Sequence, residues 1–76
     1  MSNLKIKRDR FEKVASNRVQ KSLDSLESLS KCSNKNNYEY NKEDIDKMIN
    51  VLRAKMKFVE NSFRQNIDKG NNKFNF

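Results

Sequence analysis

The strongest constraint on this chain is a run of apolar residues in its second half, separated alternately by four and three positions. The run consists of Ile45, Ile49, Leu52, Met56, Val59 and Phe63. This spacing is typical of a helix face that packs against other helices. It therefore predicts a long amphipathic helix over at least residues 45–63.

Residues at its two ends indicate where this second helix begins and ends. Asn41 has a side chain suited to an N-cap, and Asp44, at the third helical position, can accept a hydrogen bond from the Asn41 backbone. Gly70, the only glycine, stands where a left-handed residue that ends a helix is expected. We therefore expect the second helix to span residues 42–68.

The first half of the chain carries another amphipathic pattern. At about 100° per residue, one broad helical face would hold Phe11, Val14, Ala15, Val19, Leu23, Leu26 and Leu29. The helix has two candidate starts, because Ser2 can cap a helix near residue 4, whereas Asp9 with Glu12 forms a capping-box pattern near residue 10. No proline or glycine interrupts this stretch, so we expect one helix from about residue 4 or 10 to residue 31.

A polar segment, residues 30–40, separates the two patterns and is rich in serine and asparagine, which favour turns. We therefore predict an all-α fold, a two-helix antiparallel hairpin forming a single domain over residues 1–76, with a basic segment 1–9 and a flexible tail 70–76. Only 34% of the residues are hydrophobic, and so short a chain buries a small fraction of its surface. Because two such helices cannot cover each other's apolar stripes, we expect a homodimer that forms a four-helix bundle.

The chain is strongly basic, with 17 Lys and Arg, 10 Asp and Glu, and a net charge of +7. Such an excess favours nucleic acid, an anionic lipid surface or an acidic protein patch as partner, although lysine-rich chains are often simply soluble. The candidate phosphate-binding residues form an N-terminal cluster and an outward face of the second helix: Lys5, Lys7, Arg8 and Arg10, and Arg53, Lys57 and Arg64. The alternative for the second set is a solvated surface of salt bridges, because Asp46 and Glu60 share that face.

Three further residues have a functional and a structural interpretation. Arg18 falls on the apolar side of the first helix, where it could hold an anionic ligand in a groove of the bundle. Alternatively, its long side chain could extend to the edge of the stripe and pair with an acid or a carbonyl. Tyr38 and Tyr40 could stack on bases or anchor a partner, or they could pack the connection over the end of the bundle.

Val51 and Phe58 form a weaker second stripe on the second helix. The stripe lies more than about 100° around the helix axis from the main apolar face. A large aromatic side chain in water suggests a contact surface, although single exposed apolar residues are common. We predict an interface at Val51 and Phe58, either between two subunits or with a target protein.

Several classes of function are disfavoured by residue types that the chain lacks. It has no histidine and a single cysteine, Cys32, which excludes an intrachain disulfide and a His/Cys metal site. Without histidine bases, converging carboxylates or a glycine-rich phosphate loop, we expect no enzymatic activity, no catalytic residue and no cofactor. No apolar run approaches the roughly 20 residues that span a bilayer, and no secretory signal is present, so we expect a cytoplasmic protein without a membrane partner.

Two segments of the chain, RFEKVASNRV at 10–19 and SNKNNYEYNKEDI at 33–45, are followed by a helix that ends at Phe63. In these segments the chain resembles a family of small helical proteins of bacteria, phages and mobile elements, most of them uncharacterised. The resemblance covers about residues 10–64, and its most specific part is the Asn-Tyr-x-Tyr of residues 37–40. It implies a stand-alone accessory protein that interferes with host defence, as anti-CRISPR proteins do, and it transfers no functional residue.

Three hypotheses about function follow. The first is a binding protein that blocks a host nucleic-acid-handling or defence complex through Val51, Phe58, the tyrosines and the arginines, since interfaces often use aromatic and arginine anchors. The second is a basic dimeric regulator that binds RNA or DNA along its basic faces. The third is a binder of an anionic nucleotide near Arg18 and the tyrosines.

Overall fold

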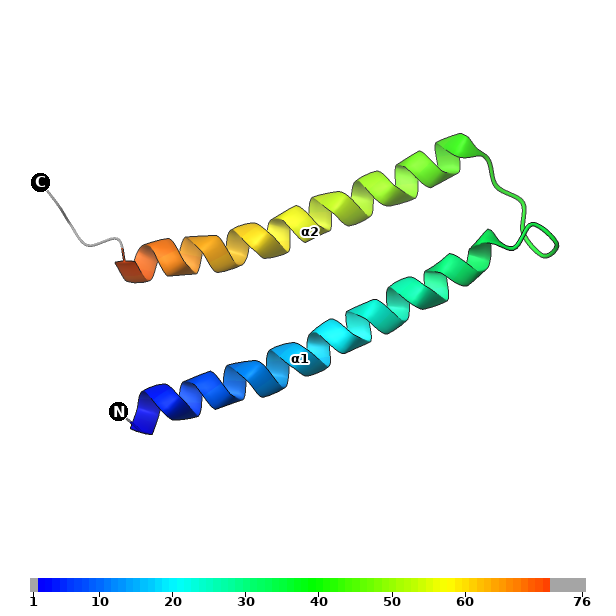
Figure 1. Cartoon of the computed structure of the whole chain (residues 1–76). Coiled ribbons are helices and arrows are strands. Elements are labelled where there is room, and N and C mark those ends of the chain that lie inside the picture. The colour runs from blue at the N-terminus through cyan, green and yellow to red at the C-terminus, as the bar shows by residue number, and fades with distance from the viewer. Residues whose placement is uncertain (1, 72–76) are drawn as a thin grey trace, which may run out of the picture. The chain divides into compact units, whose positions relative to one another are not determined.

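The computed structural model describes residues 2–71 and contains two long α-helices (Figure 1). Helix α1 spans Ser2–Ser30, the short 3-10 helix η1 spans Lys31–Ser33, and helix α2 spans Lys42–Asn71. No strand occurs in this part of the chain, which confirms the all-α class and the presence of two helices. The chain divides into two units, one containing α1 with η1 and the other containing α2.

Helix α1 begins earlier than the Asp9–Glu12 capping pattern indicates. The helix is already continuous from Ser2, so the structure favours the earlier of the two candidate starts, near residue 4, and Asp9 lies in the helix interior. The Glu12 side chain is used differently, since its Oε2 atom accepts a hydrogen bond from Arg8 Nε at 3.0 Å. An i,i+4 pair of this kind stabilises the helical conformation of the residues between its members, and these include Asp9. The C-terminal end at Ser30 is one residue before the expected position.

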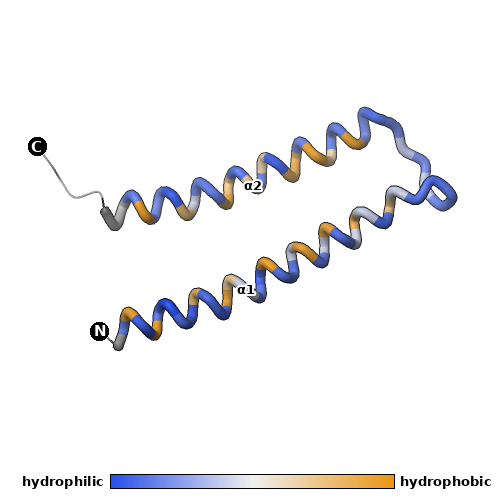
Figure 2. Tube along the Cα trace, viewed as in Figure 1, coloured by the Kyte–Doolittle hydropathy of each residue, from blue (hydrophilic) through white to orange (hydrophobic). Residues whose placement is uncertain are grey.

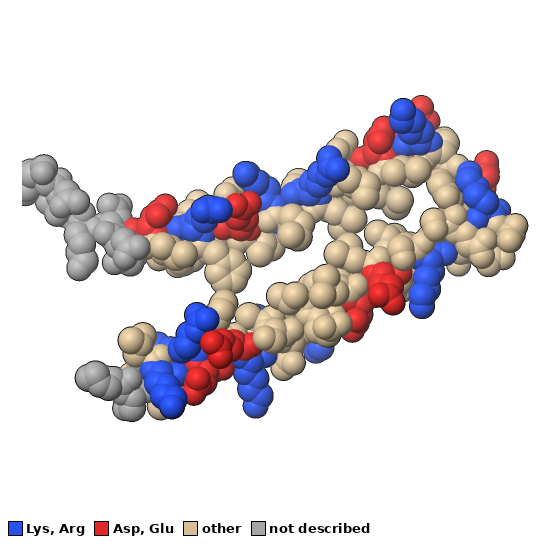
Figure 3. Space-filling view, in the orientation of Figure 1, with Lys and Arg blue, Asp and Glu red and all other residues tan. Residues whose placement is uncertain are grey.

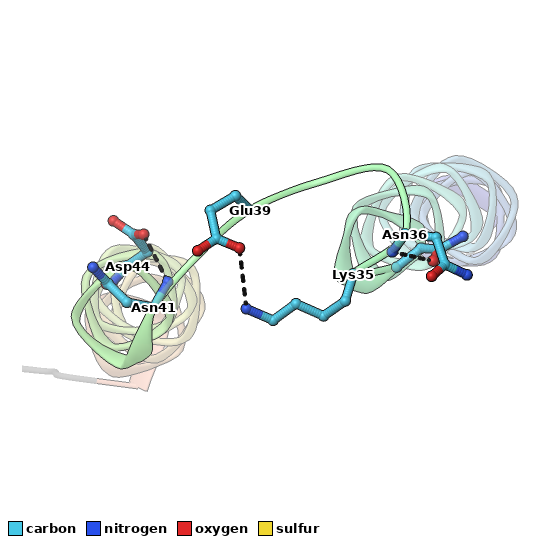
Figure 4. A network of polar contacts seen from close by, with 6 residues as sticks. Lys35, Asn36, Glu39, Asn41 and Asp44 are labelled. Atoms are coloured by element: carbon cyan, nitrogen blue, oxygen red, sulfur yellow. Dashed lines mark hydrogen bonds and ion pairs between the residues drawn. The ribbon is translucent and has the colours of Figure 1, made fainter.

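Helix α2 begins with the capping box that the sequence predicts (Figure 4). The Asp44 backbone N–H donates a hydrogen bond to Asn41 Oδ1 at 2.9 Å, and the Asn41 backbone N–H donates to Asp44 Oδ2 at 3.0 Å. Each side chain thus satisfies a backbone donor that the first turn of the helix cannot pair internally. The negative charges of Glu43 and Asp44 also lie in the first turn, at the positive end of the helix dipole.

The C-terminal end of α2 differs from the prediction. The helix continues to Asn71, so Gly70 lies within its last turn and does not follow it as a cap, and no described residue has a positive φ. Glycine disfavours a helix by about 1 kcal/mol relative to alanine, an amount that neighbouring helical contacts can offset. Residues 70 and 71 of the expected flexible tail are therefore helical, and residues 72–76 lie outside the described part of the chain.

The connection between the helices is organised by Asn34. Its side-chain oxygen accepts a hydrogen bond from the Asn36 N–H at 3.0 Å, and its carbonyl accepts from the Asn37 and Tyr38 N–H groups at 3.1 and 3.0 Å. An ion pair between Lys35 Nζ and Glu39 Oε1, 3.7 Å apart, lies in the same segment (Figure 4). The expected polar connection is therefore confirmed, with asparagine competing for the backbone as its chemistry predicts.

The apolar side chains of both helices remain accessible. None of the residues from 3 to 68 is buried, and apolar residues recur along each helix at roughly every turn (Figure 2). On α2 the most protected positions of the main apolar face are Leu52, which is half-buried, and Ile49, which is 37% exposed. No helix in the described range is long and apolar enough to cross a membrane.

Candidate interaction surfaces

Helix α2 presents two apolar surfaces. The main apolar face is the regularly spaced set predicted above: Ile45, Ile49, Leu52, Met56, Val59 and Phe63. The second apolar face consists of Val51, Ala54 and Phe58. At about 100° per residue, Val51 and Phe58 lie about 20° apart around the axis and well over 90° from the middle of the main face. Val51 is 65% exposed and Phe58 is 62% exposed, so the second apolar face is accessible.

Two lysine side chains lie next to the second apolar face. Lys55 lies one turn after Val51, and its Nζ atom stands 4.8 Å from the centroid of the Phe58 ring, a cation–π contact. Lys47 lies one turn before Val51, in a direction between those of Phe58 and Ala54, and Glu43 and Asp44 precede it on the same side of the helix. The sequence interpretation named Val51 and Phe58 but missed these two lysines. The signal was present, because positions four residues before and after an exposed apolar residue are its neighbours on a helix.

The outward polar face of α2 is partly neutralised by an ion pair. Arg64 Nη2 and Nε lie 2.8 and 2.9 Å from Glu60 Oε2, which confirms the i,i+4 pairing that the sequence suggests. The hydrogen bond from Arg64, its positive charge and that of Lys57 lower the pKa of the exposed Glu60 carboxyl below its ordinary value of 4.5. Arg53 shares this face and forms no ion pair with any residue from 3 to 68. Arg64 is therefore paired within the helix, and the cations of the outward polar face that remain available are Arg53 and Lys57.

The basic residues near the N-terminus do not form one surface. Because they belong to a continuous helix, Lys7 and Arg10 lie about 60° apart on one side of the axis, whereas Lys5 lies about 140° or more from both. Arg8 is held by Glu12 at 3.0 Å and stands 5.5 Å from the centroid of the Phe11 ring. Acidic and basic side chains also alternate along the visible surface of α1 (Figure 3). This arrangement weakens the N-terminal cluster as a single phosphate-binding patch.

Arg18 lies on an exposed part of α1 and is not enclosed by the helix. The Ser22 hydroxyl, one turn later, donates a hydrogen bond to the Arg18 carbonyl at 3.0 Å, so it is not directed toward a ligand. Tyr38 is 51% exposed and Tyr40 is half-buried, both within the connection. No observation on either side of the connection favours an enclosed nucleotide site at these residues.

The described residues offer little for metal or nucleophile chemistry. Among residues 3–68, no group of three or more Asp, Glu or Cys side chains is arranged to hold a metal ion. The Cys32 thiol is free and exposed at η1. The exposed side chains described above can take part in apolar contact, charge pairing and cation–π contact.

No protein-family model matches this chain, and neither a curated protein nor a solved structure shows significant similarity to it. The resemblance to small phage and mobile-element proteins therefore remains a prediction from residues 10–64.

Proposed function

We propose that this protein is a small, non-enzymatic binding protein. The observation that carries the proposal is the main apolar face of α2, an unbroken series of aliphatic and aromatic side chains, none of which is buried. A continuous apolar stripe on a helix is stable in water only when another helix or a partner covers it. The function of such a chain is therefore association with other macromolecules.

The proposed architecture is an antiparallel hairpin of α1 and α2, with a second copy completing a four-helix bundle. The short connection and the thin apolar content support this arrangement, because two helices bury too little surface to be stable alone. The apolar side of α1 is interrupted by Arg18 and Ser22, whereas the main apolar face of α2 has no polar interruption. We therefore place the main faces of α2 at the centre of the bundle.

The proposed target is a host nucleic-acid-handling or defence complex, which the protein blocks in the manner of an anti-CRISPR inhibitor. This part of the proposal rests on the resemblance to small phage and mobile-element proteins. The basic character of the chain supports it as well, since complexes that handle nucleic acid carry anionic groups. We place the protein in the cytoplasm, where the exposed Cys32 thiol would stay reduced.

Two measurements test this proposal. Analytical ultracentrifugation of the full chain should give the mass of a dimer at micromolar concentration, and Leu52→Lys, at the centre of the main apolar face, should give a monomer of reduced helicity. A stable, fully helical wild-type monomer would contradict the bundle. Tagged wild-type protein expressed in a bacterium should recover a nucleic-acid-handling complex in stoichiometric amount, and recovery of no such complex would contradict the proposed target.

Nucleic-acid binding is the second candidate, favoured by the net charge of +7 and by the available cations Arg53 and Lys57 on one face of α2. If it is correct, affinity for duplex and single-stranded oligonucleotides should fall steeply as salt rises. Arg53→Gln should then weaken every sequence about equally, because a phosphate contact carries no sequence information. Absence of binding at low salt would eliminate this candidate.

A further inference from the structure

We propose that one side of α1 binds the phosphate backbone of duplex nucleic acid. The surface is a basic stripe of four side chains: Lys7, Arg10, Arg18 and Lys21. This site rests on the second candidate function above, nucleic-acid binding, and lies on a different helix from the cations Arg53 and Lys57.

The helix brings together cations that are far apart in the sequence. Because α1 is continuous from Ser2 to Ser30 and turns by about 100° per residue, the four cations of the stripe fall within an arc of about 80°. All four side chains are exposed, and none forms an ion pair with any residue from 3 to 68. Arg8, by contrast, points away from the stripe and is held by Glu12 at 3.0 Å. A partner that approaches the stripe therefore meets four uncompensated positive charges.

The excess positive charge of α1 lies on this one side. The helix contains seven Lys and Arg and four Asp and Glu, so its net charge is +3. The half of its surface centred on the stripe holds four of the cations and one carboxylate, Asp24, whereas the other half holds three cations and three carboxylates. Asp24 lies about 80° from the centre of the stripe and accepts a hydrogen bond from Gln20 Nε2 at 2.9 Å. A polyanion is therefore attracted to one side of α1 and gains nothing on the other.

The four cations form two pairs with the same internal spacing. Lys7 and Arg10 are three residues apart, as are Arg18 and Lys21, and the second pair follows the first by 11 residues. At about 1.5 Å per residue, the two pairs are roughly 16 Å apart along the axis. The major groove of a duplex is about 12 Å wide with phosphates on its rims, so a helix lying across it can place one pair on each strand. Each pair also includes an arginine, which can bind phosphate oxygens in a bidentate manner.

The residues beside and between the pairs permit close approach. Val14 and Asn17 lie between them, and their side chains are short, so the longer lysine and arginine side chains extend beyond them. Asn17 and Ser25 are exposed on the same side of the helix. Amide and hydroxyl groups of this kind commonly donate hydrogen bonds to phosphate oxygens. The stripe therefore offers charge and hydrogen-bond donors, and no carboxylate of α1 lies within about 40° of its centre.

Other anionic partners fit the stripe less well. An amphipathic helix binds a bilayer by burying its apolar face, which on α1 is centred near Ala15. Arg8 lies about 20° from the direction of Ala15, so a bilayer would have to take up the Arg8–Glu12 ion pair with the apolar side chains. An acidic protein usually adds aromatic or large apolar anchors to charge pairing, but Val14 is the only apolar residue of Ser2–Ser30 within about 40° of the centre of the stripe. A phosphate backbone requires no such anchor.

The experiment measures the affinity of the full-length chain for a labelled DNA duplex of arbitrary sequence by fluorescence anisotropy. Four phosphate contacts predict a loss of affinity of about 100-fold for each chain bound when salt is raised from roughly 50 to 200 mM, because each contact releases counterions. Lys7→Gln with Arg10→Gln removes two contacts, so only about a tenfold loss should remain over the same range. Arg18→Gln with Lys21→Gln should behave in the same way, and a second duplex sequence should bind about equally.

The matched control is Lys5→Gln with Arg8→Gln, a pair with the same residue types, spacing and charge change on the other side of α1. It should keep the salt dependence of wild type and an affinity within a few-fold, and circular dichroism should show that all variants remain helical. Equal weakening by the control and the stripe variants would overturn the inference. So would equal affinity for a single strand of the same length, or binding to phosphatidylglycerol vesicles that depends on the stripe.

Failure of this site can be told apart from failure of the functions on which it depends. If Arg53→Gln removes duplex binding while both stripe variants retain it, nucleic-acid binding stands and the stripe on α1 is wrong. If wild type binds no duplex at low salt, both are wrong. The ultracentrifugation of Leu52→Lys tests the bundle independently of either result.

Discussion

Replacing Asn41 by alanine should destabilise α2 through its N-terminal cap. The substitution removes the oxygen that accepts the Asp44 N–H at 2.9 Å and leaves the reciprocal bond, 3.0 Å from the Asn41 N–H to Asp44, in place. Loss of one such cap costs about 1 kcal/mol, because the freed N–H is exposed and water replaces the oxygen only in part. The free energy of unfolding should fall by that amount, which corresponds to about a fivefold change in the unfolding constant.

The assay is urea unfolding followed by circular dichroism at one fixed protein concentration, since association changes apparent stability. With a slope of about 1 kcal/mol per molar urea for so small a chain, the midpoint should fall by about 1 M. Asn41→Ser, which keeps an oxygen acceptor, should stay within a few tenths of a kcal/mol of wild type. If Asn41→Ala and Asn41→Ser have the same midpoint, the cap does not stabilise the helix and the reasoning fails.

Three further predictions concern the rest of α2. Gly70→Ala should raise the helix signal and stabilise the chain by up to about 1 kcal/mol, since Gly70 is helical; a destabilised variant would indicate a left-handed cap. Arg64→Gln should move the pKa of Glu60 upward toward 4.5 in an NMR titration of its carboxyl carbon, and an unchanged midpoint would exclude Arg64 as the cause. Because the pKa of Glu60 is lowered in the folded chain, the stabilisation of the helix by its ionised carboxylate is complete above pH 4.5 and is lost as the pH falls through the folded pKa. In acid, the helicity of wild type should therefore decline more than that of Arg64→Gln. Phe58→Ala should leave helicity unchanged in circular dichroism, since Phe58 is 62% exposed; a large loss would mean that the ring supports the fold.

Features that depend on neighbouring residues were predictable from the sequence. The start of α2 follows from Asn41 and Asp44, whose side chains pair with each other's backbone within one turn. The polar connection follows from the asparagines, and Asn34 uses its side chain and its carbonyl as turn chemistry requires. The Glu60–Arg64 pair follows from i,i+4 spacing alone. Each of these needs only the helix or turn in which it lies.

The mistaken boundaries show where local signals compete. Asp9 and Glu12 match a capping box, yet the pattern also fits a helix interior in which Glu12 pairs with Arg8. Helix propagation is easier than nucleation, so a helix that has begun at Ser2 extends through a weak start signal. Gly70 is a similar case, because a glycine near a helix end is compatible both with the last turn and with the residue after it. A motif of one or two residues does not distinguish these alternatives.

The candidate sites show a different limit of prediction from sequence, which concerns the direction in which each side chain leaves its helix. A net charge of +7 favours acidic partners in general, but it does not say which surface they would approach. The helix supplies that direction, because it turns Lys47 and Lys55 toward the second apolar face and places Glu60 with Arg64 on the outward one. The helix also weakens the N-terminal basic cluster that the sequence suggested as one binding surface, since a helix from Ser2 distributes those cations around its axis. Basic residues adjacent in sequence are therefore a weaker indication of a binding surface here than the position of each cation around its helix relative to the exposed apolar residues.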